Sequence, residues 1–394
     1  MADLPFLCFD ADNHYYESLD AFTRHLEPGF EKRCMQWAEM GGRTRLLVGG
    51  RLNRFIPNPT FDPVARPGCL DEFFRGKNPG AADLRTLFGE LEPISPAYRE
   101  RDARLALMDE QGIEKAFMFP TLGVGMEEAL RDDLPAQRAA FRAFNRWLEE
   151  DWGFQYRDRI FATPYITLSD VDEAVAELEW ALERGCRAVC MVAGPVVTDT
   201  GTRSPADPVF DPFWSRLGEA GITLAYHGGD NGYEKHMADW GESAGLQAFK
   251  GSPLKTVMLG NRAPFDTMAA LICHGLFARH GNLRVASIEQ GSNWVPWLLQ
   301  SLRRVHGQDP RSFAEDPVET FKRHVWVSPF HEDDVPLLRE LVGADHMLMG
   351  SDFPHAEGLA VPSDYVLELD GFSDAEKRMV MRDNALALSR PRAA

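Results

Sequence analysis

Acidic and histidine side chains follow apolar runs at three widely separated places in the chain. Asp12 and His14 end the first run, His227 ends the second, and Asp352 follows the third. In a β-strand, residues two positions apart point to the same face, so Asp12 and His14 can bind one ion together. Four nitrogen and oxygen ligands brought together from strand ends would form an open site for zinc or manganese. The sequence therefore predicts a metalloenzyme.

Eight short apolar runs, most of them separated by helical patterns, must position these side chains. The predicted strands lie near residues 6–12, 116–120, 160–166, 187–192, 222–227, 283–289, 324–328 and 346–350. Strands that alternate with helices pair in parallel, and eight such units indicate a closed α/β barrel of the (β/α)₈ type. The candidate ligands would then lie at the C-terminal ends of strands one, five and eight, where barrel enzymes place their chemistry.

The segment from about residue 28 to residue 97 interrupts this rhythm. Two strand-like runs meet at Gly49-Gly50, which is typical of a hairpin, and Pro- and Gly-rich sequence follows. We interpret the segment as an insertion after the first strand, on the catalytic side of the barrel. It would serve as a lid, as a subunit contact, or as a surface elaboration that does not touch substrate. Residues 1–394 are predicted to form a single domain around this barrel.

Composition excludes several classes of partner. The net charge of -18 and the absence of a Lys/Arg cluster argue against binding to nucleic acid or to an anionic membrane. No apolar stretch approaches the roughly 20 residues that cross a bilayer. The first residues lack a basic region, so no signal peptide is predicted. The six cysteines form no CxxC pair, which indicates free thiols in a reducing compartment and hence the cytoplasm.

Four motifs resemble those of the amidohydrolase superfamily. They are Asp12-Asn-His14 with Glu17, Tyr226-His227-Gly, Ile288-Glu289-Gln-Gly-Ser-Asn-Trp294, and Gly350-Ser-Asp352-Phe-Pro-His355. The chain is most similar to the branch that contains aminocarboxymuconate semialdehyde decarboxylase and resorcylate-type decarboxylases, and the resemblance covers nearly its whole length. It implies that Asp12, His14, His227 and Asp352 bind one divalent metal, zinc or manganese. It also suggests a homodimer.

Two departures from the family pattern bear on the chemistry. The family commonly begins with His-x-His or Glu-x-His, whereas this chain has Asp-x-His, and the carboxylate should favour manganese or a less acidic zinc-bound water. The decarboxylases often carry a histidine at the end of strand six, where this chain has Glu289. Binuclear members of the superfamily bridge two metals with a carboxylated lysine at the end of strand four. That strand has no lysine here, so the resemblance implies a single metal.

The same protein groups could support two reactions on a small-molecule substrate. A metal beside a carboxylate can lower the pKa of bound water towards ~7 and so promote hydrolysis. It can instead hold a substrate carboxylate or phenolate while Asp352 or Glu289 delivers a proton to carbon as carbon dioxide leaves. We expect non-oxidative decarboxylation of an aromatic or unsaturated carboxylic acid, with hydrolysis of an amide, lactone or related carbonyl bond as the alternative. A non-catalytic binding barrel would predict a broken ligand set, and all four ligands are present.

Three further residues are candidates for supporting roles. His274 ends an amphipathic helix and could either reach the site as a catalytic group or interact with the helix dipole. His355 follows Asp352 closely enough to orient it. Glu17 could support His14 or begin a helix.

The residues predicted to contact substrate follow the ends of later strands. An aromatic side chain at Trp294 would suit a flat substrate, although a tryptophan there often packs between helices. Asp230 could line the pocket or form a turn. The candidates for substrate binding are Trp294, His331, Asp230 and Tyr233.

Overall fold

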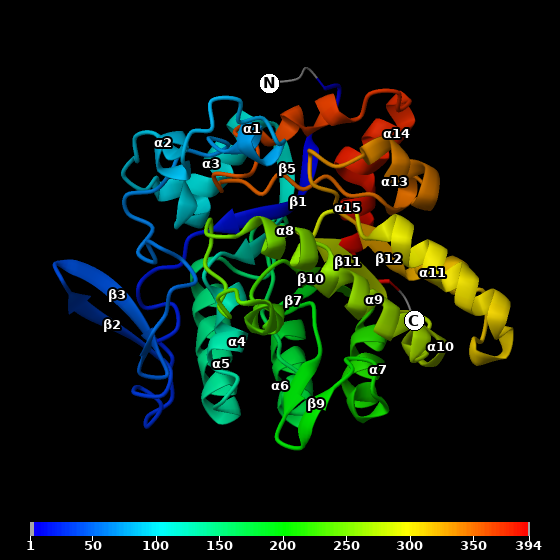
Figure 1. The fold of residues 1–394 in the computed structure, drawn as a ribbon, viewed down its shortest axis with the longest axis horizontal. Coiled ribbons are helices and arrows are strands. Elements are labelled where there is room, and N and C mark those ends of the chain that lie inside the picture. Colours follow the sequence, from blue (N-terminus) through cyan, green and yellow to red (C-terminus); the bar gives the residue numbers. More distant parts are fainter. Residues whose placement is uncertain (1–3, 393–394) are drawn as a thin grey trace.

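A ring of parallel strands forms the centre of the computed structural model, which describes residues 4–392 (Figure 1). Hydrogen bonds join the strands in the orders β1-β5-β6 and β12-β11-β10-β7, and every neighbouring pair within these two groups is parallel. The seven strands are β1 (Cys8–Tyr15), β5 (Ile113–Pro120), β6 (Ile160–Ala162), β7 (Ala188–Val192), β10 (Thr223–His227), β11 (Arg284–Ile288) and β12 (Val325–Val327).

Two irregular connections close the ring. Between β6 and β7 the Ile166 N–H donates to the Cys190 carbonyl at 3.0 Å. On the other side, segment 347–353 donates to the Val327 carbonyl of β12 at 2.9 Å, and its Met349 carbonyl accepts from β1 at 2.9 Å. This segment takes the place of the predicted eighth strand, although it forms isolated bridges instead of a regular strand. The structure therefore confirms the eight-membered α/β barrel.

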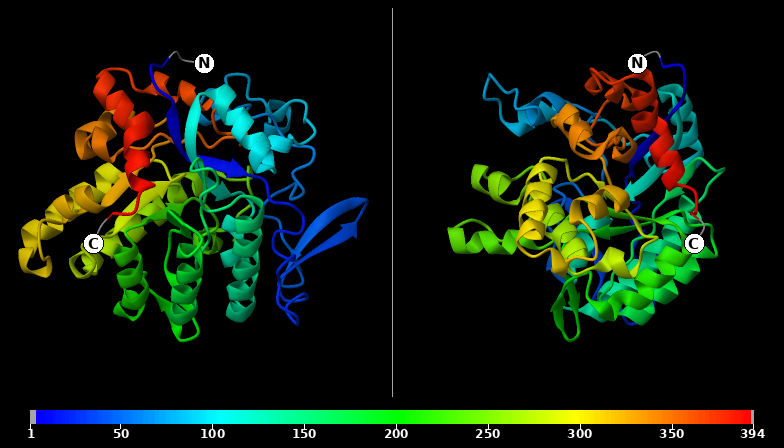
Figure 2. Two further views of the ribbon diagram at one scale, coloured as in Figure 1. Left: turned by 180° about the vertical axis from the view of Figure 1, so that it is seen from behind. Right: turned by 90° about the vertical axis from the view of Figure 1, so that its right-hand side faces the viewer.

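Helices cover the outside of the ring (Figures 1 and 2). All eight residues of β1 are buried, as expected for a strand covered on both of its faces. The longer helices are α3 (Arg101–Gln111), α5 (Leu134–Asp151), α6 (Val171–Leu182), α7 (Asp211–Ala220), α9 (Arg262–Cys273), α11 (Val295–Gln308), α12 (Pro317–His324) and α13 (Val335–Val342). Shorter elements are β8 (Val196–Thr198), β9 (Gly201–Arg203), α4 (Met126–Ala129), α8 (Pro253–Leu259), α10 (Leu276–Arg279), α14 (Asp374–Arg378) and α15 (Asn384–Leu388). Among the described residues, none of these helices is long and apolar enough to cross a membrane.

The insertion between β1 and β5 contains an arm, residues 35–52, and a roof, residues 68–88. Figures 1 and 2 show the arm projecting away from the barrel. Its hairpin pairs β2 (Met35–Met40) with β3 (Arg43–Val48), and the Gly49-Gly50 turn adds only the short β4 (Arg51–Leu52). The predicted turn is therefore present, but the longer partner strand, β2, was not predicted.

The roof packs on the loop that follows segment 347–353. It carries α1 (Asp71–Phe74) and α2 (Leu84–Phe88). The Gly68 N–H donates to the His355 carbonyl at 3.1 Å, and the Leu70 N–H donates to the Ala356 carbonyl at 2.7 Å. Gly68 has a φ of +72°, and a Cβ there would lie 2.7 Å from a backbone nitrogen, so glycine permits this close approach. The roof therefore covers the end of the barrel that carries the predicted site.

Candidate active site

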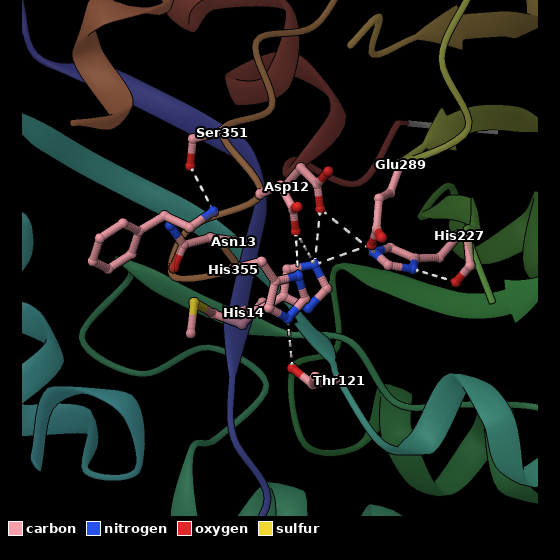
Figure 3. Close-up of polar contacts among 12 residues, drawn as sticks. Asp12, Asn13, His14, Thr121, His227, Glu289, Ser351 and His355 are labelled. Carbon is pink, nitrogen blue, oxygen red and sulfur yellow. Dashed lines mark hydrogen bonds and ion pairs between the residues drawn. The ribbon is translucent and has the colours of Figure 1, made fainter. Parts of the chain in front are cut away.

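Four side chains from three strands bring ligand-type atoms to one point (Figure 3). His14 Nε2 lies 3.3 Å from Asp12 Oδ1 and 3.3 Å from Glu289 Oε2. His227 Nε2 lies 3.4 Å and 3.1 Å from the same two oxygens. Ligand atoms around a tetrahedral ion are about 3.3–3.4 Å apart when each bond is about 2.0–2.1 Å long. The spacing of this group, which we call the ligand cluster, therefore suits one divalent ion.

Several atoms of the ligand cluster are buried without a partner. Asp12 Oδ1, both ring nitrogens of His14 and Nε2 of His227 accept or donate no hydrogen bond within the described residues. His227 Nδ1 donates to the Gly228 carbonyl at 2.8 Å, which leaves a lone pair on Nε2 facing the cluster. Buried polar atoms without partners are costly, and a bound cation would remove that cost. The residues therefore fit a metal ion.

Asp352 belongs to a second group that overlaps the first. Its Oδ1 lies 3.3 Å from His14 Nε2, on which the first group also converges. The second group consists of His14, Glu289, Asp352 and His355. The structure thus brings Asp12, His14 and His227 to one point together with Glu289, and it places Asp352, the fourth ligand that the resemblance implied, beside His14.

A short hydrogen bond joins Asp352 and His355. Thr121 Oγ donates to the Tyr15 carbonyl at 2.9 Å, so it accepts from His355 Nε2, which lies 3.0 Å away. Burial and the nearby His14 hold the pKa of His355 well below its usual value, so the ring is neutral and its Nδ1 carries a lone pair. Burial and repulsion by Glu289 raise the pKa of Asp352 well above its usual range. Asp352 Oδ1 lies 2.5 Å from His355 Nδ1 in a hydrogen bond, and the raised pKa of Asp352 favours its carboxyl group as the donor.

The carboxylates make the ligand cluster attractive to a cation. Burial opposes charge on His14, yet the facing carboxylates of Asp12 and Glu289 raise the pKa of the ring to about 10. Burial would raise the pKa of Asp12, but the facing rings of His14 and His227 hold it well below its usual value. The carboxylates around His14 therefore favour positive charge at this point, which a divalent ion would supply.

Both proton-carrying candidates lie on unusual backbone. Glu289 has a φ of 50° and Asp352 a φ of 56°, in the left-handed region that side chains with a Cβ seldom adopt. Such strain costs of order 1–3 kcal/mol and persists only where surrounding contacts enforce it. Glu289 follows β11 and Asp352 lies in segment 347–353, with β12 between them, and both carboxyl groups turn towards the ligand cluster.

Two buried charged residues that were not predicted support the cluster from below. Asp10 accepts from Ser351 Oγ at 2.5 Å and from the Ser351 N–H at 3.0 Å, which ties β1 to the segment that carries Asp352. Arg104 is fully buried and donates to the His14 carbonyl at 2.8 Å and to the Ala97 carbonyl at 2.6 Å. Asp10 lies two positions before Asp12, so strand alternation could have indicated it. Arg104 lies on a helix about 90 residues away, and no local pattern marked it.

Three predicted residues do not reach the cluster, which corrects their assignment. His274 caps α9, is exposed, and pairs with Ser204 Oγ at 2.9 Å. Barrel helices run antiparallel to the strands, so the end of α9 lies at the opposite end of the barrel. Trp294 is buried, donates to the Gly291 carbonyl at 2.9 Å and packs as a core residue. Asp230 accepts from the Gly232 N–H at 3.1 Å and forms a turn.

The other supporting candidates lie near the site. His331 Nε2 contacts Asp71 of the roof at 2.6 Å, and Tyr233 donates to Asp266 at 3.1 Å. Glu17 accepts from two backbone N–H groups of the loop after β5, each at 2.9 Å, and therefore supports that loop instead of His14. Burial raises the pKa of Glu17 to about 7.

Two adjoining cavities open beside the ligand cluster. The inner cavity, about 170 Å³, is lined by Asp12, Phe74, Glu289, Ser328, Pro329, Phe330, His331, Glu332, Gly350, Asp352, Glu357 and Gly358. The outer cavity, about 740 Å³, extends from His227 and Tyr233 past the roof to α8 and α9. The two cavities share Phe74, Glu289 and Phe330. Roof residues thus line both cavities, so the insertion contributes to the site.

The chain belongs to the amidohydrolase family, whose model matches residues 89–390. A solved amidohydrolase from Mycobacterium avium subsp. paratuberculosis K-10 is 47% identical, with a TM-score of 0.94 over 98% of this chain and 100% of that one. This confirms the resemblance inferred from the four motifs, and with it the status of the protein as an enzyme. A search of curated proteins finds no match.

More distant solved structures share the fold. A 2,6-dihydroxybenzoate decarboxylase from Rhizobium is 19% identical, with a TM-score of 0.59 over 83% of this chain and 96% of that one. A 5-carboxyvanillate decarboxylase from Novosphingobium aromaticivorans, solved with bound manganese, is 16% identical, with a TM-score of 0.60 over 98% of this chain and 97% of that one. At these identities the likeness establishes the architecture alone.

Proposed function

We propose that this protein is a metal-dependent, non-oxidative decarboxylase of an aromatic or unsaturated carboxylic acid. The observation that carries the proposal is the place of the Asp352 carboxyl group, which lies beside the ligand cluster, is hydrogen-bonded to His355 and faces the inner cavity. Loss of carbon dioxide leaves a carbon that must gain a proton, and Asp352 lies where its carboxyl group can deliver one. General acids in such positions contribute roughly 10²–10⁴ to the rate.

The metal-binding role falls to Asp12, His14, His227 and Asp352, with Glu289 close enough to join them or to transfer a proton. A divalent ion bound there supplies positive charge that polarises and orients the substrate. Manganese is our first choice, because the oxygen-rich ligand set suits a hard ion and because distant decarboxylases of this fold are solved with manganese. Thr121 orients the ring of His355, and His355 in turn orients the Asp352 carboxyl group towards the inner cavity.

Hydrolysis of a neutral carbonyl bond is the second candidate, because the inner cavity is acidic. Glu332 and Glu357 line it in addition to the three carboxyl groups already described, and both have a buried oxygen without a hydrogen-bond partner among residues 4–392. Burial raises the pKa of Glu357 to about 7 and also raises that of Glu332. An acidic cavity repels a carboxylate unless the metal and these protonated groups compensate. An amide or lactone meets no such repulsion.

One experiment separates the two reactions. The manganese-loaded enzyme is offered a panel of hydroxybenzoates, unsaturated acids, lactones and amides, and released carbon dioxide is measured. Carbon dioxide that disappears in the Asp352→Asn variant supports decarboxylation. Proton release from a lactone or amide, without carbon dioxide, assigns the protein to the hydrolases. The homodimer, the cytoplasmic location and the single domain spanning residues 1–394 stay predictions, and light scattering tests the first of them.

A further inference from the structure

The outer cavity differs from the inner one in the chemistry of its walls. Apolar side chains dominate it, and they come from the roof, from loop 246–252, from α8 and from the first turns of α9. Its charged residues besides Glu289 are few: Glu234 is paired with the buried Lys255, and Lys250 is exposed. Water in such a space makes few hydrogen bonds, so an apolar group that displaces it gains free energy.

The covering of the outer cavity is built from two separate parts of the chain. The Ala248 N–H donates to the Phe55 carbonyl at 2.8 Å, which joins loop 246–252 to the insertion. Phe88 of α2 and Phe249 of the loop pack edge to face, with ring centroids 5.1 Å apart. Phe249 has a φ of 61°, so the backbone accepts strain to point this ring at the roof. Specific contacts therefore hold the two segments together over the outer cavity.

The outer cavity is also much larger than one aromatic ring requires. Its volume of about 740 Å³ lies within the range of roughly 300–1,000 Å³ that accommodates drug-sized ligands. It is continuous with the ligand cluster through His227 and Glu289. A single-ring acid held at the ligand cluster would leave most of this apolar space filled with water.

We propose that the outer cavity is a subsite for a bulky apolar part of the substrate, such as a fused ring system or a long hydrocarbon chain attached to the reacting group. The proposal rests on the proposed reaction centre and deepens it by naming the substrate class. The inner cavity would take the polar, reacting end, and Phe74 and Phe330 would separate the two ends.

Binding of two metal-chelating probes tests the subsite without any turnover. Benzohydroxamate and 2-naphthohydroxamate carry the same chelating group and differ by one fused ring. Calorimetry on the full, manganese-loaded chain should give a Kd about tenfold lower for the naphthyl compound, the gain expected when roughly 50 Å² of ring surface leaves water. Equal Kd values within twofold would overturn the proposal, and so would the failure of both probes to bind.

Adjacent residues of α8 provide a matched pair of variants. Leu259 lines the outer cavity, whereas Met258 does not line it and is 37% exposed. Leu259→Asp should abolish the preference for the naphthyl probe and leave benzohydroxamate binding unchanged, while Met258→Asp should retain the tenfold preference. If Leu259→Asp does not fold, Leu246→Ser on the neighbouring loop provides the same test. A retained preference in the cavity variants would overturn the proposal.

Results with the two assays distinguish the subsite from the reaction. If no acid releases carbon dioxide but the naphthyl preference holds, the proposed reaction is wrong and the subsite stands. If carbon dioxide is released and the two hydroxamates bind equally, the reaction stands and the subsite is only a passage for solvent.

Discussion

The inner and outer cavities share a wall but are built in different ways. The inner cavity owes its acidic groups to strand ends and to the loops that follow them, whose backbone is fixed by barrel hydrogen bonds. The outer cavity owes its apolar surface to the insertion and to segments between β10 and α9. Chemistry therefore depends on the rigid ring, and the choice of substrate depends on additions to it. Four predictions test this division of roles.

The largest expected effect is on the rate, through the inner cavity. Asp352→Asn replaces the carboxyl group that can supply a proton to carbon, so kcat should fall about 10³-fold. Glu357→Gln changes another carboxyl group of the same cavity and should lower kcat less than tenfold. Steady-state kinetics and metal analysis of both variants give the measurement. An Asp352→Asn enzyme that retains its metal and a tenth of its activity would contradict the assigned role.

The second effect is on stability, through one buried cationic side chain near each cavity. Arg104→Met leaves the His14 and Ala97 carbonyls without their donor and should reduce the free energy of unfolding by about 4 kcal/mol. Lys255→Met on the outer side should reduce it by about 1–2 kcal/mol, because Lys255 donates to Ser243 Oγ and the Gly245 carbonyl of one loop, and its partner Glu234 lines the outer cavity. Urea denaturation followed by fluorescence measures both values. Equal losses in the free energy of unfolding would show that the wall of the outer cavity contributes as much to stability as the barrel does.

The third effect is a pH dependence that originates at Glu17. Burial raises the pKa of this carboxyl group from 4.5 to about 7, so the folded state holds a proton that the unfolded state releases. Stability should then fall as pH rises from 4.5 to 7, by about 3 kcal/mol from this group alone.

The Glu17→Gln variant removes that titration and keeps an oxygen to accept both backbone N–H groups. Its free energy of unfolding should change less between pH 5 and pH 8 than that of the unaltered protein. The reverse result, a steeper decline in the variant, would contradict the raised pKa.

The smallest expected effect is on kcat, through the side chain that lies between the two cavities. Phe74 lines both of them, and its neighbour Phe73 lines the outer one alone. Phe74→Ala should admit water to the inner cavity and lower kcat about fivefold, equivalent to about 1 kcal/mol. Phe73→Ala should change KM and leave kcat within twofold. A similar loss of kcat in both variants would show that Phe74 does not separate the two cavities.

The sequence allowed the prediction of those parts of the site that depend on local geometry. Asp12 and His14 share a face because side chains alternate along a strand, and the ends of parallel strands must meet at one end of a barrel. The roof could not be predicted in this way, because its contacts join Asp71 to His331 and Gly68 to His355, across more than 250 residues. No periodicity encodes such pairings.

Side-chain type alone gave wrong predictions for residues whose role depends on the end of the barrel at which they lie or on how they pack. His274 has a suitable side chain, but it ends a helix, and helices end at the face opposite the site. Trp294 immediately follows a site strand, yet its indole is buried against the core and lines neither cavity. In both cases the tertiary arrangement of the element, and not the chemistry of the residue, determined its role.

The left-handed backbone at Glu289 and Asp352 has a consequence for laboratory evolution. Asparagine and glycine tolerate this conformation better, and each substitution there should relieve roughly 1 kcal/mol of strain. A library screened only for heat resistance should therefore accumulate these residues at both positions, in clones that no longer turn over substrate. Screening the same library for turnover should retain the acids. The two screens would diverge at these positions and so identify the reactive residues without any designed variant.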